Sequence, residues 1–191
     1  MEYLFNFNES LQKLGYHSLW LEYSFLNEQE LTQQIADFCK SEDKNSEHYR
    51  YRTFRLFLSK QTVLDDASVQ KYIELVQLDY DRSMAKSALI NLVEFKGLSI
   101  DQLEYLSSHP AFADPVLQKK FSKVKLSNAL ESQTTSIDQN LFQQILAFKD
   151  FELQDRMIKK NALTTAQYEL LAEKGTNKAI RNIAKQILNQ Q

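Results

Sequence analysis

The stretch Leu98-Ser99-Ile100-Asp101-Gln102-Leu103 carries the clearest structural signal in this sequence. The Ser99 hydroxyl can accept a hydrogen bond from the Gln102 amide, and the Gln102 side chain can accept one from the Ser99 amide. Together these bonds make a capping box. Leu98 and Leu103 flank the box and can form a hydrophobic staple. The pattern therefore predicts that a helix begins at Ser99.

Related start signals recur on both sides of this stretch. Leu26-Asn27-x-x-Glu30-Leu31 and Leu163-Thr164-x-x-Gln167-Tyr168 keep the box and its apolar neighbours, whereas Ser136-x-x-Gln139 keeps the box alone. With helix-length apolar patterns, these signals predict first helices that start at residues 27, 68, 99, 136 and 164. The second helix of each pair is expected at 48–60, 81–96, 114–125, 150–160 and 177–191, and 126–135 is the longest polar break.

The second helices also resemble one another. The stretch Asp114-x-x-Leu117-Gln118 matches Asp150-x-x-Leu153-Gln154. Most of these helices open with a residue suited to capping, namely Asp81, Asp114, Asp150 and Asn177. Self-similar two-helix units of this length indicate an α-solenoid, in which stacking of neighbouring units supplies the core.

On these residues, the chain resembles HEAT or armadillo-type repeat proteins over residues 27–190, with 1–26 as an N-terminal cap. The resemblance implies an all-α fold, a right-handed α-solenoid of about five irregular two-helix repeats in a single domain over 1–191. An irregular helical bundle is the alternative. Within the cap, Asn8 is predicted to start a short helix that Gly15 ends. Residues 17–26 mix a helical with an alternating pattern; a helix is expected there, and a strand is the alternative.

The composition agrees with a helical class. With only 3 Gly and 2 Pro, the chain has few residues for the turns of an all-β protein. A chain of 191 residues, 43% of them hydrophobic, is long enough to bury about 70% of its unfolded surface. No apolar run of about 18 residues occurs, and Cys39 has no second cysteine to pair with. We therefore expect a cytoplasmic protein that does not enter a membrane.

Signatures of catalysis and of metal binding are missing from the sequence. His17, His48 and His109 are far apart, no His-Glu-x-x-His or Cys-x-x-Cys motif occurs, and the glycines are too few for a phosphate-binding loop. The pair Asp65-Asp66 is interpreted as the cap of the helix that follows, rather than as an acid–base pair. We expect no enzymatic activity, no catalytic residue, no metal and no cofactor.

The charges are unevenly distributed between the two kinds of helix. The second helices hold 17 Lys and Arg against 6 Asp and Glu, a net charge of +11, whereas the rest of the chain carries −13. The second helices are therefore expected to form a basic layer that binds a partner. The alternative is that the two layers neutralise one another at their edges, as solvated faces commonly do.

The most distinctive local stretch is His48-Tyr-Arg-Tyr-Arg-Thr-Phe-Arg55. On a helix, Arg52 and Arg55 share one face with His48, away from Phe54. Arginine pairs well with carboxylates and phosphates, and tyrosine suits interfaces. Arginines that simply pair with nearby glutamates are the alternative. The candidate partner-binding residues are His48, Tyr49, Arg50, Arg52, Arg55, Lys86, Lys119, Lys123, Arg156, Lys159, Arg181 and Lys185.

These observations favour a non-enzymatic protein-binding module. In size, fold and charge the chain is similar to bacterial toxin-immunity proteins of armadillo-like fold, and this resemblance implies an inhibitor that covers the active site of a cognate toxin. A nucleic-acid-binding or DNA-repair protein is an alternative, because HEAT-like DNA glycosylases hold DNA on a cationic surface. The net charge of −2 disfavours it. An adaptor for acidic or phosphorylated peptides is a second alternative.

Overall fold

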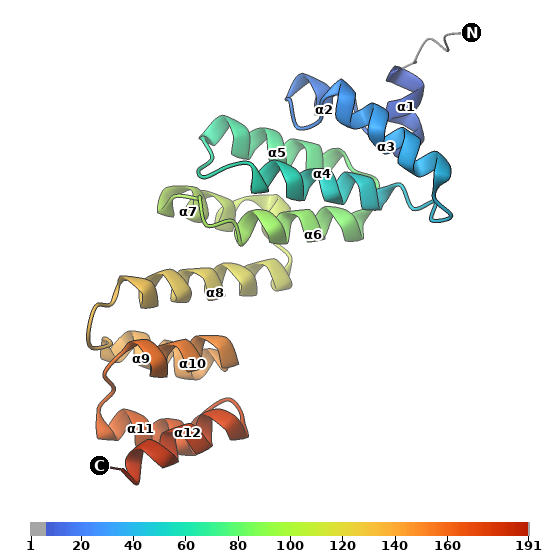
Figure 1. Cartoon of the computed structure of the whole chain (residues 1–191). Coiled ribbons are helices and arrows are strands. Elements are labelled where there is room, and N and C mark those ends of the chain that lie inside the picture. The colour runs from blue at the N-terminus through green and yellow to red at the C-terminus, as the bar shows by residue number, and fades with distance from the viewer. Residues whose placement is uncertain (1–6, 191) are drawn as a thin grey trace. The chain divides into compact units, whose positions relative to one another are not determined.

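The structure is a computed structural model of the full chain, and it describes residues 7–190. Within these residues the chain forms twelve α-helices and one 3₁₀ helix, and no strand (Figure 1). The prediction of an all-α fold is therefore confirmed. No helix in this part of the chain is both long and apolar enough to span a membrane.

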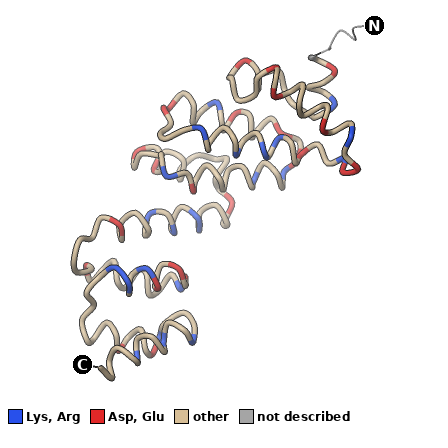
Figure 2. The backbone as a smooth tube through the Cα atoms, viewed as in Figure 1, with Lys and Arg blue, Asp and Glu red and all other residues tan. Residues whose placement is uncertain are grey.

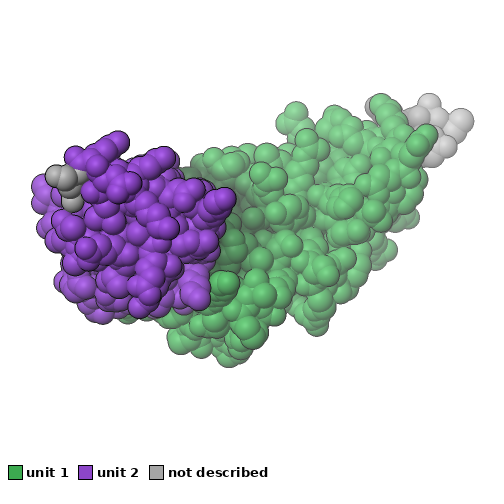
Figure 3. Space-filling view, turned by 90° about the horizontal axis from the view of Figure 1, so that it is seen from below, with its two compact units in different colours: residues 1–120 green, residues 121–191 purple. Residues whose placement is uncertain are grey.

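Contacts between residues divide the chain into two compact units, residues 1–120 and 121–191 (Figure 3). Repeat arrays also show such divisions, because each repeat contacts only its neighbours. The single domain over 1–191 therefore remains a prediction, and the units are described separately.

Unit 1 holds the first seven α-helices and the 3₁₀ helix. These are α1 (Phe7–Leu14), α2 (Leu19–Glu22), α3 (Glu28–Lys40), α4 (Glu47–Ser59), α5 (Asp66–Leu78), α6 (Arg82–Val93), α7 (Ile100–Ser108) and η1 (Pro110–Phe112). Helix α4 packs on α6, α5 on α6 and α1 on α3. The core is aromatic: the rings of Trp20 and Phe54 have centroids 4.4 Å apart, and those of Phe54 and Tyr72 are 4.7 Å apart.

Helix α1 ends at Gly15, as predicted. Gly15 has a φ of +71°, its amide donates to the Gln12 carbonyl, and the Tyr16 amide donates to the Leu11 carbonyl. This pattern is a Schellman motif, which favours glycine because the residue after the helix adopts a left-handed conformation with a positive φ. The predicted cap Asn8 is wrong, because it lies inside the first turn of α1. Residues 17–26 hold only the short helix α2 and turns.

Unit 2 begins within α8 (Pro115–Ser132), which starts at the end of unit 1, and it contains the last four helices. These are α9 (Gln139–Phe148), α10 (Phe151–Lys160), α11 (Thr165–Lys174) and α12 (Lys178–Leu188). Helix α9 packs on α11, and α10 packs on α12. The core of this unit includes the fully buried Phe142, Ile145, Leu153, Met157 and Leu171.

The predicted helix starts depend on caps that the structure contains. The Gln102 amide donates to Ser99 Oγ over 3.1 Å, and the Ser99 amide donates to Gln102 Oε1 over 3.0 Å. The capping boxes at Asn27 and Thr164 form in the same way. The single caps form at Asp65, Asp81, Asp150 and Asn177, and Asp114 accepts from the Val116 amide. Local sequence therefore fixes where most helices begin.

Helix α5 begins at Asp66 rather than at residue 68, and α6 ends at Val93 rather than at residue 96. Two further boundaries differ because of longer-range contacts. Ser136 does not cap α9, because its backbone forms a bridge with Ala162, and Asp138 accepts the amide hydrogen bonds at the start of the helix instead. The break predicted at 126–135 is also wrong over its first part. Helix α8 continues to Ser132, since Leu130 is buried in the core of unit 2.

Candidate functional site

Helix α4 has two faces that differ in burial. Arg50, Phe54 and Leu58 lie on the inner face and are buried. We call the exposed side the α4 outer face, and it consists of His48, Arg52, Arg55, Leu56 and Ser59. Leu56 is 42% exposed, so this face combines two arginines with an apolar side chain.

Arg50 is held in the core by several acceptors. Its Nε and Nη2 atoms donate to the two carboxylate oxygens of Asp79 over 2.6 and 3.2 Å. Its Nη1 atom donates to the Leu14 carbonyl over 2.7 Å and to the hydroxyls of Ser46 and Tyr80 over 3.0 Å. Arg50 thus joins the end of α1, the start of α4 and the segment between α5 and α6.

This network corrects the prediction that Arg50 binds a partner. Its exposed fraction is 0%, and burial, the largest single effect, lowers the pKa of the guanidinium. The hydrogen bonds to Asp79, the charge of Asp79 and the contribution of Tyr80 together outweigh burial, so the pKa is raised. Removing one member of such a buried pair leaves an unpaired charge in the core. Arg50 is buried because of its position around the helix: Arg50, Phe54 and Leu58 are spaced by four residues and lie on the same apolar stripe.

Arg52 and Arg55 behave differently. Both are exposed, and among residues 7–190 neither has an acidic partner. The neighbouring candidates are engaged within the chain: His48 Nδ1 lies 2.8 Å from Asp43 Oδ2, and the ring of Tyr49 packs edge-on against Phe38. Among the basic side chains of α4, these two arginines therefore remain available to another molecule.

Most other candidate cations pair with acids of this chain. Lys86 lies 2.8 Å from Asp114, Lys123 lies 3.1 Å from Asp150, and Lys159 lies 2.7 Å from Asp155. Further pairs join Lys123 to Glu152, Arg156 and Lys160 to Glu131, and Lys120 to Glu94. Lys119 makes an intramolecular interaction as well, whereas Lys185 is exposed without a partner among residues 7–190.

Several of these pairs link one second helix to the start of the next. Lys86 of α6 meets Asp114 before α8, and Lys123 of α8 meets Asp150 before α10. The hydrogen bond from Lys86 lowers the pKa of Asp114 below its ordinary value. Part of the basic charge is therefore balanced by acids at the starts of neighbouring second helices. Figure 2 marks the basic and acidic positions along the backbone.

A second repeated contact involves the fourth residue after the cap. Gln118 Nε2 donates to the Ser107 carbonyl at the end of α7, over 3.0 Å, and Gln154 Nε2 makes longer bonds to carbonyls near the end of α9. Arg181 occupies the same position in α12 and donates to the Gly175 carbonyl over 2.8 Å. The candidate Arg181 is thus already bonded to the end of the preceding helix. The repeat of Gln118 and Gln154 in the sequence was the signal for this contact.

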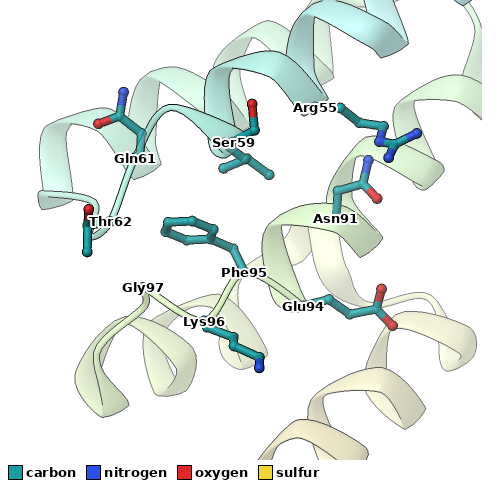
Figure 4. Close-up of a pocket in the computed structure, with 10 residues that line it drawn as sticks. Arg55, Ser59, Gln61, Thr62, Asn91, Glu94, Phe95, Lys96 and Gly97 are labelled. Carbon is teal, nitrogen blue, oxygen red and sulfur yellow. The ribbon is translucent and has the colours of Figure 1, made fainter.

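A hollow of about 530 Å³ lies between the C-terminal ends of α4 and α6 (Figure 4). Its lining includes Arg55 and Ser59 of the outer face, together with Asn91, Phe95 and Lys96. A smaller hollow of about 340 Å³ lies between the N-terminal ends of the same helices, next to His48 and Tyr51. The outer face therefore borders a separate hollow near each of its ends. Phe95 and Asn91 belong to no sequence motif, so they are not among the predicted site residues.

No group of three or more His, Cys, Asp or Glu side chains suited to a metal occurs among the residues that the structure describes. Comparison with known proteins gives no match to a protein-family model, a curated protein or a solved structure. The interpretation of the site therefore rests on its geometry and charge.

Proposed function

We propose that this chain is a non-enzymatic protein-binding module that holds an acidic partner surface on the α4 outer face. The observation that carries the proposal is the contrast among its cations. Arg52 and Arg55 are exposed without an acidic partner in residues 7–190, whereas Lys86, Lys123 and Arg156 already pair within the chain. A paired cation must lose its partner before it binds another, and a free one need not.

The composition of this face also suits an interface. Arginine is enriched at protein contacts because its planar fork binds a carboxylate through two parallel bonds. Leu56 lies beside Arg52 and Arg55 and is 42% exposed, so a partner can bury apolar area there as well. Charges on such a face also speed association with an acidic partner.

The proposed architecture is the right-handed α-solenoid of about five irregular HEAT- or armadillo-like repeats. It is supported by the packing of like helices: α4 contacts α6, α10 contacts α12, and α9 contacts α11. The recurring contacts of Gln118, Gln154 and Arg181 with the end of a preceding helix support it too.

An immunity protein that neutralises a bacterial toxin is the specific form of this proposal. Such an inhibitor covers the active site of its toxin, and an acidic toxin surface would meet Arg52 and Arg55. An adaptor for acidic or phosphorylated peptides would use the same arginines. Nucleic-acid binding has less support, because a phosphate track needs free cations and Lys86, Lys123 and Arg156 are paired.

The test is affinity capture from the native host with the full chain as bait. We compare the wild type with the double variant Arg52→Glu/Arg55→Glu and with the matched control Lys125→Glu/Lys178→Glu. The control changes the same amount of charge at exposed lysines that lack a partner in residues 7–190. We expect a one-to-one complex with an acidic protein that the control retains and the double variant loses.

Two results would reject the proposal. One is equal capture by the double variant and the control, since the α4 outer face would then be irrelevant to binding. The other is sequence-independent binding of DNA at low salt that weakens steeply as salt rises, which is the behaviour of a phosphate-contacting surface.

A further inference from the structure

We propose that the hollow between the C-terminal ends of α4 and α6 receives an aromatic side chain of the acidic partner, while Arg55 pairs with a carboxylate beside that side chain. This inference rests on the proposed function, because it names the chemical group that the partner presents to the α4 outer face.

The floor of the hollow is apolar. Leu58 and Phe95 both line it, and Leu58 is only 7% exposed. In Figure 4 the ring of Phe95 lies between the end of α4 and the segment at Gly97. A second aromatic ring gains both apolar burial and ring contact when it packs against such a ring. Aromatic anchors in pockets of this kind commonly dominate binding.

One wall of the hollow is formed by the backbone at Gly97, where there is no room for a side chain. A Cβ atom at Gly97 would lie 2.2 Å from the Thr62 carbonyl oxygen and 2.5 Å from Cε1 of Phe95. The Leu64 amide also donates to the Gly97 carbonyl, over 3.4 Å. The segments at Thr62 and Gly97 therefore run close together, and glycine keeps this wall free of a side chain that would displace Phe95.

The rim of the hollow is cationic. Arg55 and Lys96 both belong to the lining, and neither has an acidic partner among residues 7–190. The acid of the lining, Glu94, is already bound by Lys120 of α8, so it does not compete for Arg55. A carboxylate of the partner would therefore find the Arg55 fork free to form two bonds with it.

The spacing of these groups defines the partner segment. Arg55 and Ser59 both line the hollow and lie four residues apart on α4, a rise of about 6 Å. Since Arg55 is part of the lining, a ring in the hollow and a carboxylate at Arg55 would be neighbours, a short distance apart. An aromatic residue next to an aspartate or glutamate in the partner sequence spans this distance.

The probe for this site is 3-phenylpropionate, which joins a phenyl ring to a carboxylate. We add it to the full-length ¹⁵N-labelled chain and follow the backbone amide signals of Ser59, Lys96 and Gly97. We expect saturable shifts with a dissociation constant near millimolar. The neutral 3-phenylpropionamide and the ring-free propionate should each bind about tenfold more weakly, because each lacks one of the two contacts.

Variants separate the two contacts. Arg55→Gln should weaken 3-phenylpropionate to the level of the amide, and the matched control Arg82→Gln, an exposed arginine outside the lining, should leave binding unchanged. Ser59→Trp should fill the hollow and abolish the shifts for every aromatic probe while it keeps Arg55. Thermal unfolding of each variant shows whether it is folded. If Ser59→Trp does not fold, the comparison of Arg55→Gln with Arg82→Gln still tests the inference.

Several results would overturn the inference. Equal shifts with the carboxylate and its amide would remove the role of Arg55, and equal shifts with propionate would remove the aromatic pocket. Saturable binding of phenyl phosphate with none of 3-phenylpropionate would assign the site to phosphorylated side chains. If the probes fail while partner capture still depends on Arg52 and Arg55, the hollow is rejected and the proposed function stands. If capture fails as well, both are rejected.

Discussion

The two faces of α4 give the same residue type opposite roles. Arg50 has an exposed fraction of 0% and donates to acceptors in three separate segments, whereas Arg52 and Arg55 are exposed without an acidic partner among residues 7–190. A step of two residues along a helix rotates the side-chain direction by about 200°, so Arg50 and Arg52 point to different environments. The comparison teaches that position on the helix, rather than charge, decides which arginine is available for binding.

The largest effect should come from breaking the inner face. Arg50→Ala leaves the carboxylate of Asp79 buried without its partner, and it should lower the free energy of unfolding by about 3–5 kcal/mol. Arg52→Ala on the same helix should change it by less than about 0.5 kcal/mol. Chemical denaturation measures both. Similar losses for the two variants would show that the faces are not energetically distinct.

A double substitution sharpens the meaning of that loss. Arg50→Met with Asp79→Leu removes both charges together, so no charge remains buried and unpaired. The double variant should be about 0.5–3 kcal/mol more stable than the sum of the single losses predicts. A double-mutant cycle by denaturation measures this coupling. Strict additivity would mean that the pair does not act as a unit.

The next effect extends the comparison to unit 2, where a buried glutamine has a similar joining role. Gln154 is fully buried, and its Oε1 atom accepts a hydrogen bond from the Thr176 amide over 2.9 Å. Gln154→Ala should therefore lower the free energy of unfolding by about 1–3 kcal/mol. The control Gln143→Ala changes an exposed glutamine of α9 and should have almost no effect. Thermal unfolding of the pair measures the difference, and equal melting temperatures would contradict the assigned role.

The smallest effect on stability is expected at the outer face. Arg52→Glu/Arg55→Glu should change the free energy of unfolding by less than about 1 kcal/mol, because exposed charges contribute little. The same variant should lose the partner. A large loss of stability would instead mark these arginines as structural, and loss of binding could then be explained by unfolding.

Helix starts could be predicted from sequence because caps are local. The bonds between Ser99 and Gln102 join residues three positions apart, and so do those between Thr164 and Gln167. Such short patterns are visible without knowledge of the fold. The start of α9 was missed because a longer-range contact intervened: Ser136 pairs with Ala162 and leaves capping to Asp138.

The candidate site could be predicted only in part. The phase of α4 placed Arg52 and Arg55 outside correctly, and the same phase argument would have placed Arg50 inside. The ion pairs were not predictable in this way, since Lys86 and Asp114 are 28 residues apart and nothing local links them. Counting charges by helix therefore overstated the basic surface. The hollow beside Phe95 depends equally on segments that are distant in sequence.

The Arg50 network has a further consequence for how α1, α4 and the segment before α6 fit together. Apolar contacts are non-directional and tolerate small slides between helices, whereas the donors of Arg50 meet fixed acceptors at Leu14, Asp79 and Tyr80. A shift of any one segment would break these bonds together. The network therefore selects a single register, and a hydrocarbon replacement of similar stability would be expected to sample several packings where the natural chain holds one.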